Sequence, residues 1–276
     1  MSFPRGRHFQ VAPMKPVNTL LLVSLILLSS VAYPQHRSAS SANIRLKGAA
    51  LAFGGVQIKE ENIHPKTHSG LMMNLAYKKL NIGSRFSTYT FGIGASFLNT
   101  NLEDPFSSAH LELLSEYSYS FAVYDNRRFR YFLGPEGRLQ YAVSVYPNWD
   151  DSHLYWANYV SLGVCNYLQY LATKENVLLF RLSVPFFSVS SRPTLNRKEK
   201  MDDFTFGGII KSLHGNLQAG SVSSVFYLKC DLDYFFSFSD KIKQSVGYTF
   251  HYERLDHKEG NPVRTLYHAI GLRLYF

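Results

Sequence analysis

Apolar and polar residues alternate along this chain with a period of two, over segments that are long for strands. Between Phe129 and Val145 the odd positions are mostly apolar or aromatic, and the even positions are mostly charged, polar or small. Strands in soluble proteins usually have about 3–10 residues. An alternation from 129 to 145 therefore indicates a taller wall, of the height that crosses a membrane.

The same alternation recurs in four other regular segments, and five less regular ones complete a set of ten. The regular segments are 85–98, 109–124, 242–253 and 265–276, and the others are 44–58, 69–79, 155–171, 176–190 and 223–237. Single-chain bacterial barrels have an even number of strands. The sequence therefore predicts an all-β fold over 44–276, a transmembrane, antiparallel, up-and-down β-barrel of about ten strands.

The connections between these segments alternate in length. Short ones fall near 80–84, 124–127, 172–175 and 238–240, and longer ones near 59–68, 99–108, 146–154, 191–222 and 254–264. Short periplasmic turns and longer external loops are typical of outer-membrane barrels. The long loop 191–222 leaves an alternative open, because Phe204-Thr205-Phe206 and Ile209-Ile210 would form another hairpin and give twelve strands.

Residues 1–32 have the pattern of a cleaved secretory signal peptide. Lys15 precedes an apolar run from Leu20 to Ala32, whose last residues are small. The run is shorter than the ~20 apolar residues that a spanning helix needs. We therefore expect export through the inner membrane, with Met14 as an alternative start and a short N-terminal lead at 33–43.

Composition and charge favour lipid on one face of the wall and a charged lumen on the other. Hydrophobic residues make up 46% of the chain and charged residues 18%, which excludes disorder. The chain has 21 Phe and 19 Tyr, and many tyrosines fall near segment ends, where aromatic girdles meet the membrane surface. A secreted β-sandwich also alternates, but it does not explain these tyrosines.

Charges in the middle of the segments lie opposite the apolar face, so we expect them to point into the lumen. Isolated buried ions are expensive, and pairs are available. We expect Glu112 and Glu116 beside Arg130 and Arg138, and Arg181 beside Lys229, Asp231 and Asp233. The predicted lumen charge network comprises Glu112, Glu116, Arg130, Glu136, Arg138, Arg181, Lys229, Asp231, Asp233 and Arg273.

The last segment resembles the C-terminal insertion signal of Gram-negative outer-membrane β-barrel proteins. Gly271, Leu274 and Phe276 match that signal, whereas Ala269 replaces its polar residue. In style the chain is most similar to the small barrels of Bacteroidota. The resemblance implies an outer-membrane location, insertion by the barrel-assembly machinery, and outer-membrane lipids and lipopolysaccharide as partners.

A ten-stranded wall encloses a narrow interior, which side chains can fill. We therefore expect a small barrel that acts in small-solute permeation, envelope integrity or surface interaction, without a cofactor. The favoured interpretation of the charges is packing that plugs the lumen, and a thin porin-like path is the alternative. Membership of a larger envelope complex is a further alternative.

An enzyme is the rival interpretation, and we favour it less. Asp151-Ser152-His153 has the Asp-x-His spacing of the ten-stranded omptin proteases, in which carboxylates and an imidazole activate water. Asp150 adds a carboxylate, and Glu103 and Asp104 are the nearest acids for a facing pair. The alternative is thus a hydrolase of peptides or lipids with Asp150, Asp151 and His153 near the rim.

The remaining candidate sites have weaker signals. Basic residues are spread over the loops, so no nucleic-acid partner is expected. The loop 191–222 places Arg192, Arg197, Lys198 and Lys200 where they would bind lipopolysaccharide phosphates, although a solvated loop is the favoured interpretation. Strand parity places Cys165 and Cys230 on opposite faces, and no zinc spacing occurs.

Overall fold

The computed structural model describes residues 44–61, 66–100, 107–126, 128–146, 154–173, 176–193, 205–237, 243–256 and 260–276. The predicted signal peptide at 1–32 and the lead at 33–43 lie outside these residues. The long strands are β1 (Ile44–Glu60), β2 (Thr67–Ile82), β3 (Arg85–Asn99), β4 (Ser107–Asp125), β5 (Phe129–Val145), β6 (Leu154–Leu171), β7 (Val177–Ser191), β9 (Val225–Ser237), β10 (Lys243–Leu255) and β11 (Val263–Tyr275).

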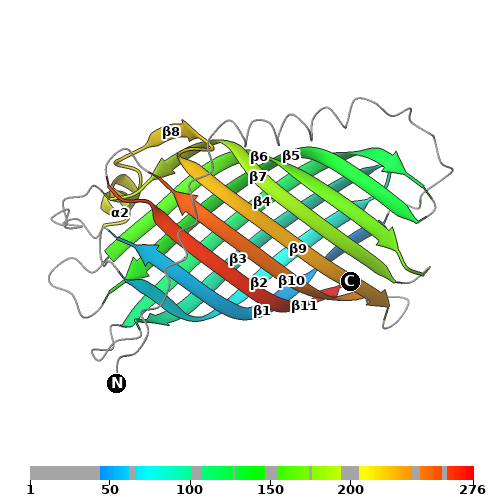
Figure 1. Ribbon diagram of the computed structural model, residues 1–276, viewed down its shortest axis with the longest axis horizontal. Coiled ribbons are helices and arrows are strands. Elements are labelled where there is room, and N and C mark those ends of the chain that lie inside the picture. Colours follow the sequence, from blue (N-terminus) through cyan, green and yellow to red (C-terminus); the bar gives the residue numbers. More distant parts are fainter. Residues whose placement is uncertain are drawn as a thin grey trace, which may run out of the picture. The chain divides into compact units, whose positions relative to one another are not determined.

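These strands form one antiparallel sheet that closes on itself as a barrel (Figure 1). Each long strand pairs with the next long strand along the chain, and β1 pairs with β11 from Gly48 opposite Tyr275 to Glu60 opposite Val263. Closure pairs the edge strands that an open sheet would leave exposed. The prediction of a closed, antiparallel ten-stranded barrel is confirmed, with strand ends within a few residues of those expected.

The long loop 191–222 does not form an additional transmembrane hairpin, so the twelve-strand alternative is wrong. Its described part contains a helix, α2 (Phe206–Leu213), and a short strand, β8 (Gln218–Ser221). Thr205 caps the helix, because its hydroxyl accepts a hydrogen bond from the Gly208 N–H. The apolar residues of this segment follow the spacing of a helix rather than a strand: Phe206, Ile209, Ile210 and Leu213.

β8 and β9 lie one after the other along the same edge of β7. β9 pairs with β7 from Val177 to Ser183, and β8 pairs with it from Phe187 to Ser190. The turn at 222–224 separates them. β8 therefore extends the β9 position of the wall at its long-loop end and adds no transmembrane strand.

The alternation of the sequence becomes an outside and an inside. In β4, Leu111 and Tyr117 are exposed on the outer surface, whereas Glu116 and Ser118 are buried inside. Large apolar residues cover the outer surface of the other strands too, with exposed fractions of 80% at Leu71, 65% at Ile270 and 53% at Ile93. Such an extent of exposed apolar surface is what lipid covers in a transmembrane barrel.

Among the described residues, no helix has the length and apolar character needed to cross a bilayer.

We expect Ile93→Arg to lower the free energy of unfolding in lipid by about 2–4 kcal/mol, because it places a cation near the middle of the lipid-facing wall. The matched control is Thr67→Arg, at an exposed position where β2 begins at the long-loop end, where the expected loss is about 0–1 kcal/mol. Urea unfolding in liposomes measures both. Equal losses would argue against a lipid-facing outer surface.

Candidate functional site

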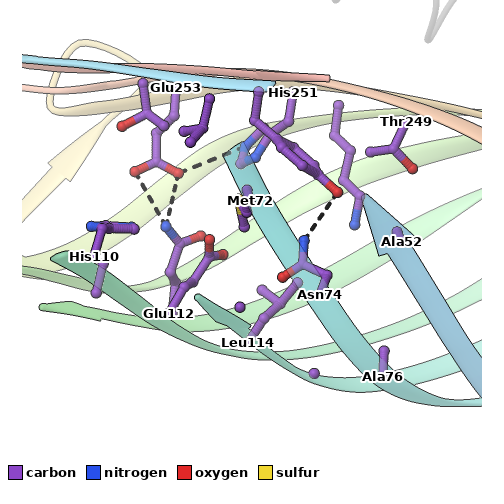
Figure 2. A pocket seen from close by; sticks show the side chains of 18 of the residues that line it. Ala52, Met72, Asn74, Ala76, His110, Glu112, Leu114, Thr249, His251 and Glu253 are labelled. Atoms are coloured by element: carbon purple, nitrogen blue, oxygen red, sulfur yellow. Dashed lines mark hydrogen bonds and ion pairs between the residues drawn. The ribbon is translucent and has the colours of Figure 1, made fainter. Parts of the chain in front are cut away.

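The candidate site is the lumen, where inward-facing residues form layers along the barrel axis. The wall made by β11, β1, β2 and β3 carries mostly small inward residues, and it borders a cavity of about 110 Å³ (Figure 2). The small residues are Ala50, Ala52, Ala76, Gly92, Gly94 and Gly271. At Gly94, a Cβ atom would collide with the side chain of Asn74. These small side chains therefore leave space on this side of the lumen.

The opposite side of the lumen carries a charged network centred on Arg181 of β7. Its guanidinium lies 3.2 Å from Glu116, 2.5 Å from Glu136 and 3.4 Å from Asp231. These acids come from β4, β5 and β9, so one side chain joins strands that are distant in sequence. All four residues are at most 6% exposed.

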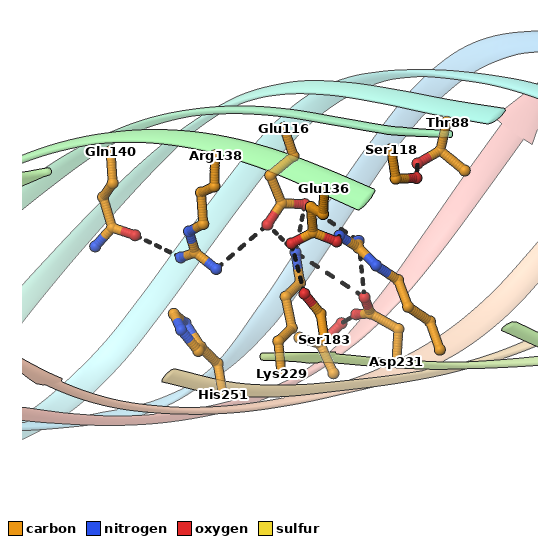
Figure 3. Close-up of polar contacts among 12 residues, drawn as sticks. Thr88, Glu116, Ser118, Glu136, Arg138, Gln140, Ser183, Lys229, Asp231 and His251 are labelled. Atoms are coloured by element: carbon orange, nitrogen blue, oxygen red, sulfur yellow. Dashed lines mark hydrogen bonds and ion pairs between the residues drawn. The ribbon is translucent and has the colours of Figure 1, made fainter. Parts of the chain in front are cut away.

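Glu116 of β4 is the most heavily bonded carboxylate of the network. Lys229 of β9 donates to both of its oxygens at 2.7 Å, and Arg138 of β5 lies 3.3 Å away. Figure 3 shows Glu116 and Glu136 reaching from one wall toward Lys229 and Asp231 on the facing wall. Three cations (Arg138, Arg181, Lys229) thus balance three anions (Glu116, Glu136, Asp231), which is the condition for burying charge at tolerable cost.

Hydroxyl groups and amides complete the bonding of this network. Ser183 donates to Glu136 at 2.5 Å, and Thr249 donates to Asp231 at 2.6 Å. Toward the long-loop end, Tyr159 donates to Glu253 at 2.8 Å and to Gln140 at 2.9 Å. Arg138 also bonds Gln140, which joins the two parts. Such connected networks hold a buried polar region in one arrangement.

Of the ten residues predicted for the network, the structure brings six into the group around Glu116 and Arg181. Glu112 lies at its margin, 4.0 Å from Arg138. Asp233 and Arg273 form a separate ion pair between β9 and β11. Both are buried.

The prediction for Arg130 is wrong, because this residue does not lie beside Glu112 or Glu116. It pairs with Asp125 at 3.2 Å and donates to the carbonyl oxygen of Gly83 at 2.5 Å. The reason is its height on β5: Arg130 is the second residue of the strand and faces the short-turn end. The register places Glu116 opposite Arg138, eight residues further along the strand.

An apolar and aromatic layer fills the lumen at the short-turn end, and it was not predicted. Phe86 is fully buried, with its ring centroid 4.3 Å from Tyr167 and 5.3 Å from Phe132. We call this layer the aromatic plug; it consists of Leu46, Leu80, Ile82, Phe86, Phe132, Cys165, Tyr167, Leu179, Phe235 and Tyr275. The signal for it was the presence of apolar residues at inward positions next to the short turns.

A second apolar cluster lies at the long-loop end, where it forms the upper lining of the cavity. It includes Val56, Ile58, Met72, Tyr155 and Val263.

Two groups at the rim have shifted pKa values. A hydrogen bond from Lys59 lowers the pKa of Glu61, whose carboxylate lies 2.6 Å from the Lys59 ammonium. Burial raises the pKa of Tyr146, which follows β5.

The structure does not test the hydrolase alternative. Asp150, Asp151 and His153 lie outside the described residues, as do Glu103 and Asp104, so the hydrolase alternative stays a prediction. His251 and Glu253 face the lumen with 3.6 Å between Nε2 and Oε2. Within the described part of the chain, no group of three or more His, Cys, Asp or Glu side chains is placed to hold a metal ion.

The two cysteines lie on opposite faces of the wall, as parity predicts. Cys165 is fully buried in the aromatic plug, Cys230 is half-buried on the outer face, and both are free thiols. Of the insertion-signal residues, Gly271 faces the lumen and Leu274 and Phe276 are exposed on the outside.

A closed antiparallel barrel with an apolar exterior and a charged interior defines a transmembrane β-barrel of the outer-membrane type. No protein-family model matches the chain, and no curated protein is significantly similar to it in sequence.

Solved structures with a similar course of the chain are themselves barrels of this type. The outer membrane protease OmpT from Escherichia coli matches with a TM-score of 0.48 and 7% identity, over 86% of this chain and 99% of that one. The translocator domain of the autotransporter NalP from Neisseria meningitidis gives 0.42 and 8%, over 94% and 98%. Neisserial surface protein A gives 0.35 and 10%, over 84% and 97%. At these identities the similarity concerns the fold alone.

Proposed function

We propose that this chain is an outer-membrane barrel whose lumen is closed by its own side chains, and that it acts in envelope integrity or surface interaction rather than as an open pore. The observation that carries the proposal is the charge-balanced group around Glu116 and Arg181. It spans the lumen from β4 and β5 to β7 and β9. Outer-membrane lipids and lipopolysaccharide are the proposed surroundings.

The electrostatics support a permanently closed arrangement. Each charge of the group has an oppositely charged partner within 3.4 Å. Moving one side chain aside would leave its partners buried and uncompensated, which is far more costly than breaking an exposed ion pair. A solute therefore has no inexpensive way to displace the network.

The aromatic plug supports the same conclusion from the other end. The cavity extends from Val56 and Tyr155 at the long-loop end down to Lys78, Thr90 and Arg273. Below this level, Phe86, Phe132 and Tyr167 pack against one another. The cavity is thus bounded at the short-turn end, and a path for solutes would have to cross this layer.

We expect the purified, folded protein to give no resolvable current steps in planar lipid bilayers, because the network fills one side of the lumen and the aromatic plug closes the short-turn end below the cavity. A general porin reconstituted in parallel serves as the positive control. Folding is verified by heat-modifiable mobility on gels, which a closed barrel gives. Ion-selective steps from the folded protein would sink the closed-lumen proposal and favour permeation.

A further inference from the structure

A hollow with four basic side chains lies at the short-turn end. We call it the basic hollow and define it by Arg45, Lys47, Lys79 and Arg85; its volume is about 810 Å³, and Tyr119 lines one side. All four basic side chains are exposed. The prediction that basic residues are merely spread over loops is therefore incomplete, because the barrel gathers these four from three strands.

The sheet register creates the cluster. Lys47 of β1 lies directly opposite Lys79 of β2, and Arg45 lies opposite Asn81. Asn81 in turn lies opposite Ser87 of β3, two residues from Arg85. Cβ atoms of directly opposite residues are about 4.5–5.5 Å apart, and like charges in such positions repel. An anion bound between the two lysines would offset this repulsion.

No carboxylate of the described residues forms an ion pair with any of the four cations. Two acids at the same end of the barrel already have other partners. Asp125 pairs with Arg130, and Asp233 pairs with Arg273 inside the lumen. Arg85 donates to the Tyr119 hydroxyl at 2.5 Å, which fixes its guanidinium at the side of the hollow. The basic hollow is thus a preformed positive site.

The outer surface next to the hollow is apolar. One step further up the strands, Ala49 lies opposite Tyr77, followed by Leu51 opposite Leu75. Phe276, which is 77% exposed, lies beside Lys47 through a backbone hydrogen bond of 2.8 Å. A ligand that fills the hollow with its anionic part would lay an apolar part against this belt. That combination describes an amphiphile.

We propose that the basic hollow binds the phosphate headgroup of an anionic glycerophospholipid in the periplasmic leaflet. Lysine and arginine form strong charge-assisted hydrogen bonds with phosphate, and basic residues at a membrane surface attract anionic lipids. Outer-membrane barrels place short turns on the periplasmic side, where the leaflet contains glycerophospholipids. The acyl chains lie along Tyr77, Leu75 and Leu51.

The test uses the full mature chain, folded in neutral detergent and mixed with phosphatidylglycerol, phosphatidylethanolamine or lipid A. Native mass spectrometry counts the lipids that each protein molecule retains. We expect preferential retention of one phosphatidylglycerol, and a drop of about tenfold or more in K47Q/K79Q. Heat-modifiable mobility verifies that the variants fold.

A control double variant, R128Q/K243Q, removes two positive charges at the same end of the barrel but outside the hollow; Arg128 is exposed and Lys243 is half-buried. Arg128 lies in the β4–β5 turn, and Lys243 begins β10. Retention by this variant should equal that of the unchanged protein. Equal losses in both double variants would overturn the proposal in favour of diffuse charge attraction. Preference for lipid A over phosphatidylglycerol at the hollow would overturn it in favour of a lipopolysaccharide site.

Discussion

Replacing Arg181 with alanine is expected to lower the free energy of unfolding by about 3–5 kcal/mol, the loss typical when one partner of a buried ion pair is removed. Arg181 contacts Glu116, Glu136 and Asp231 in the lumen. Without its guanidinium, three buried carboxylates keep only Lys229 and Arg138 as counter-charges. Arg138 also meets three acids, but its contacts with Glu112 and Glu253 are 4.0 Å long, longer than any of the three that Arg181 makes.

Urea unfolding of the folded protein in detergent or liposomes measures this loss. The matched control is Arg254→Ala, which also removes an arginine from an ion pair but at a more exposed position on β10. Arg254 pairs with Asp256 at 2.6 Å, and the two side chains are 39% and 31% exposed. We expect a change of about 1 kcal/mol or less there. A similar small change at Arg181 would show that water already screens the network.

The double variant F86A/F132A is expected to convert a silent barrel into a conducting one. Phe86 and Phe132 are both fully buried in the aromatic plug, which closes the short-turn end below the cavity. Removing both rings connects the open side of the lumen, along Ala76 and Gly92, to the short-turn end. Each substitution also costs about 3–5 kcal/mol of stability, so folding is checked before the recording.

Planar-bilayer recording and uptake of a small dye by liposomes measure the opening. F91A/F121A is the matched control, because it removes two phenylalanines that are exposed on the lipid-facing side of β3 and β4. This control should stay silent. Currents from both variants would indicate general loosening of the wall, whereas silence from folded F86A/F132A would show that the charged network alone closes the lumen.

Much of the barrel followed from local sequence patterns. Period-two alternation placed Glu116, Arg138 and Lys229 on one face and Leu111 and Ile93 on the other, because successive side chains of a strand point to opposite sides. Loop lengths separated the two ends of the barrel. The helix α2 was missed, although the spacing of Phe206, Ile209, Ile210 and Leu213 follows a helical period.

The sequence was less able to predict which side chains pair with each other across the lumen. The sequence put Arg130 with the charged network, but height along a strand decides which inward residues meet, and register sets that height. Arg130 therefore meets Asp125 near the short turns, while Glu116 meets Lys229 from a strand more than a hundred residues away. The aromatic plug was overlooked for the same reason, since its residues come from the ends of many strands.

By itself, the sequence determined the class of fold and the face on which most residues lie, because these depend on neighbours within one strand and on turn length. Only the tertiary structure decided between ten and twelve strands, which charges pair, where the lumen closes, and that four cations from three strands share one hollow. Those outcomes depend on register and closure, which join distant segments at a common height and leave no trace in a local pattern.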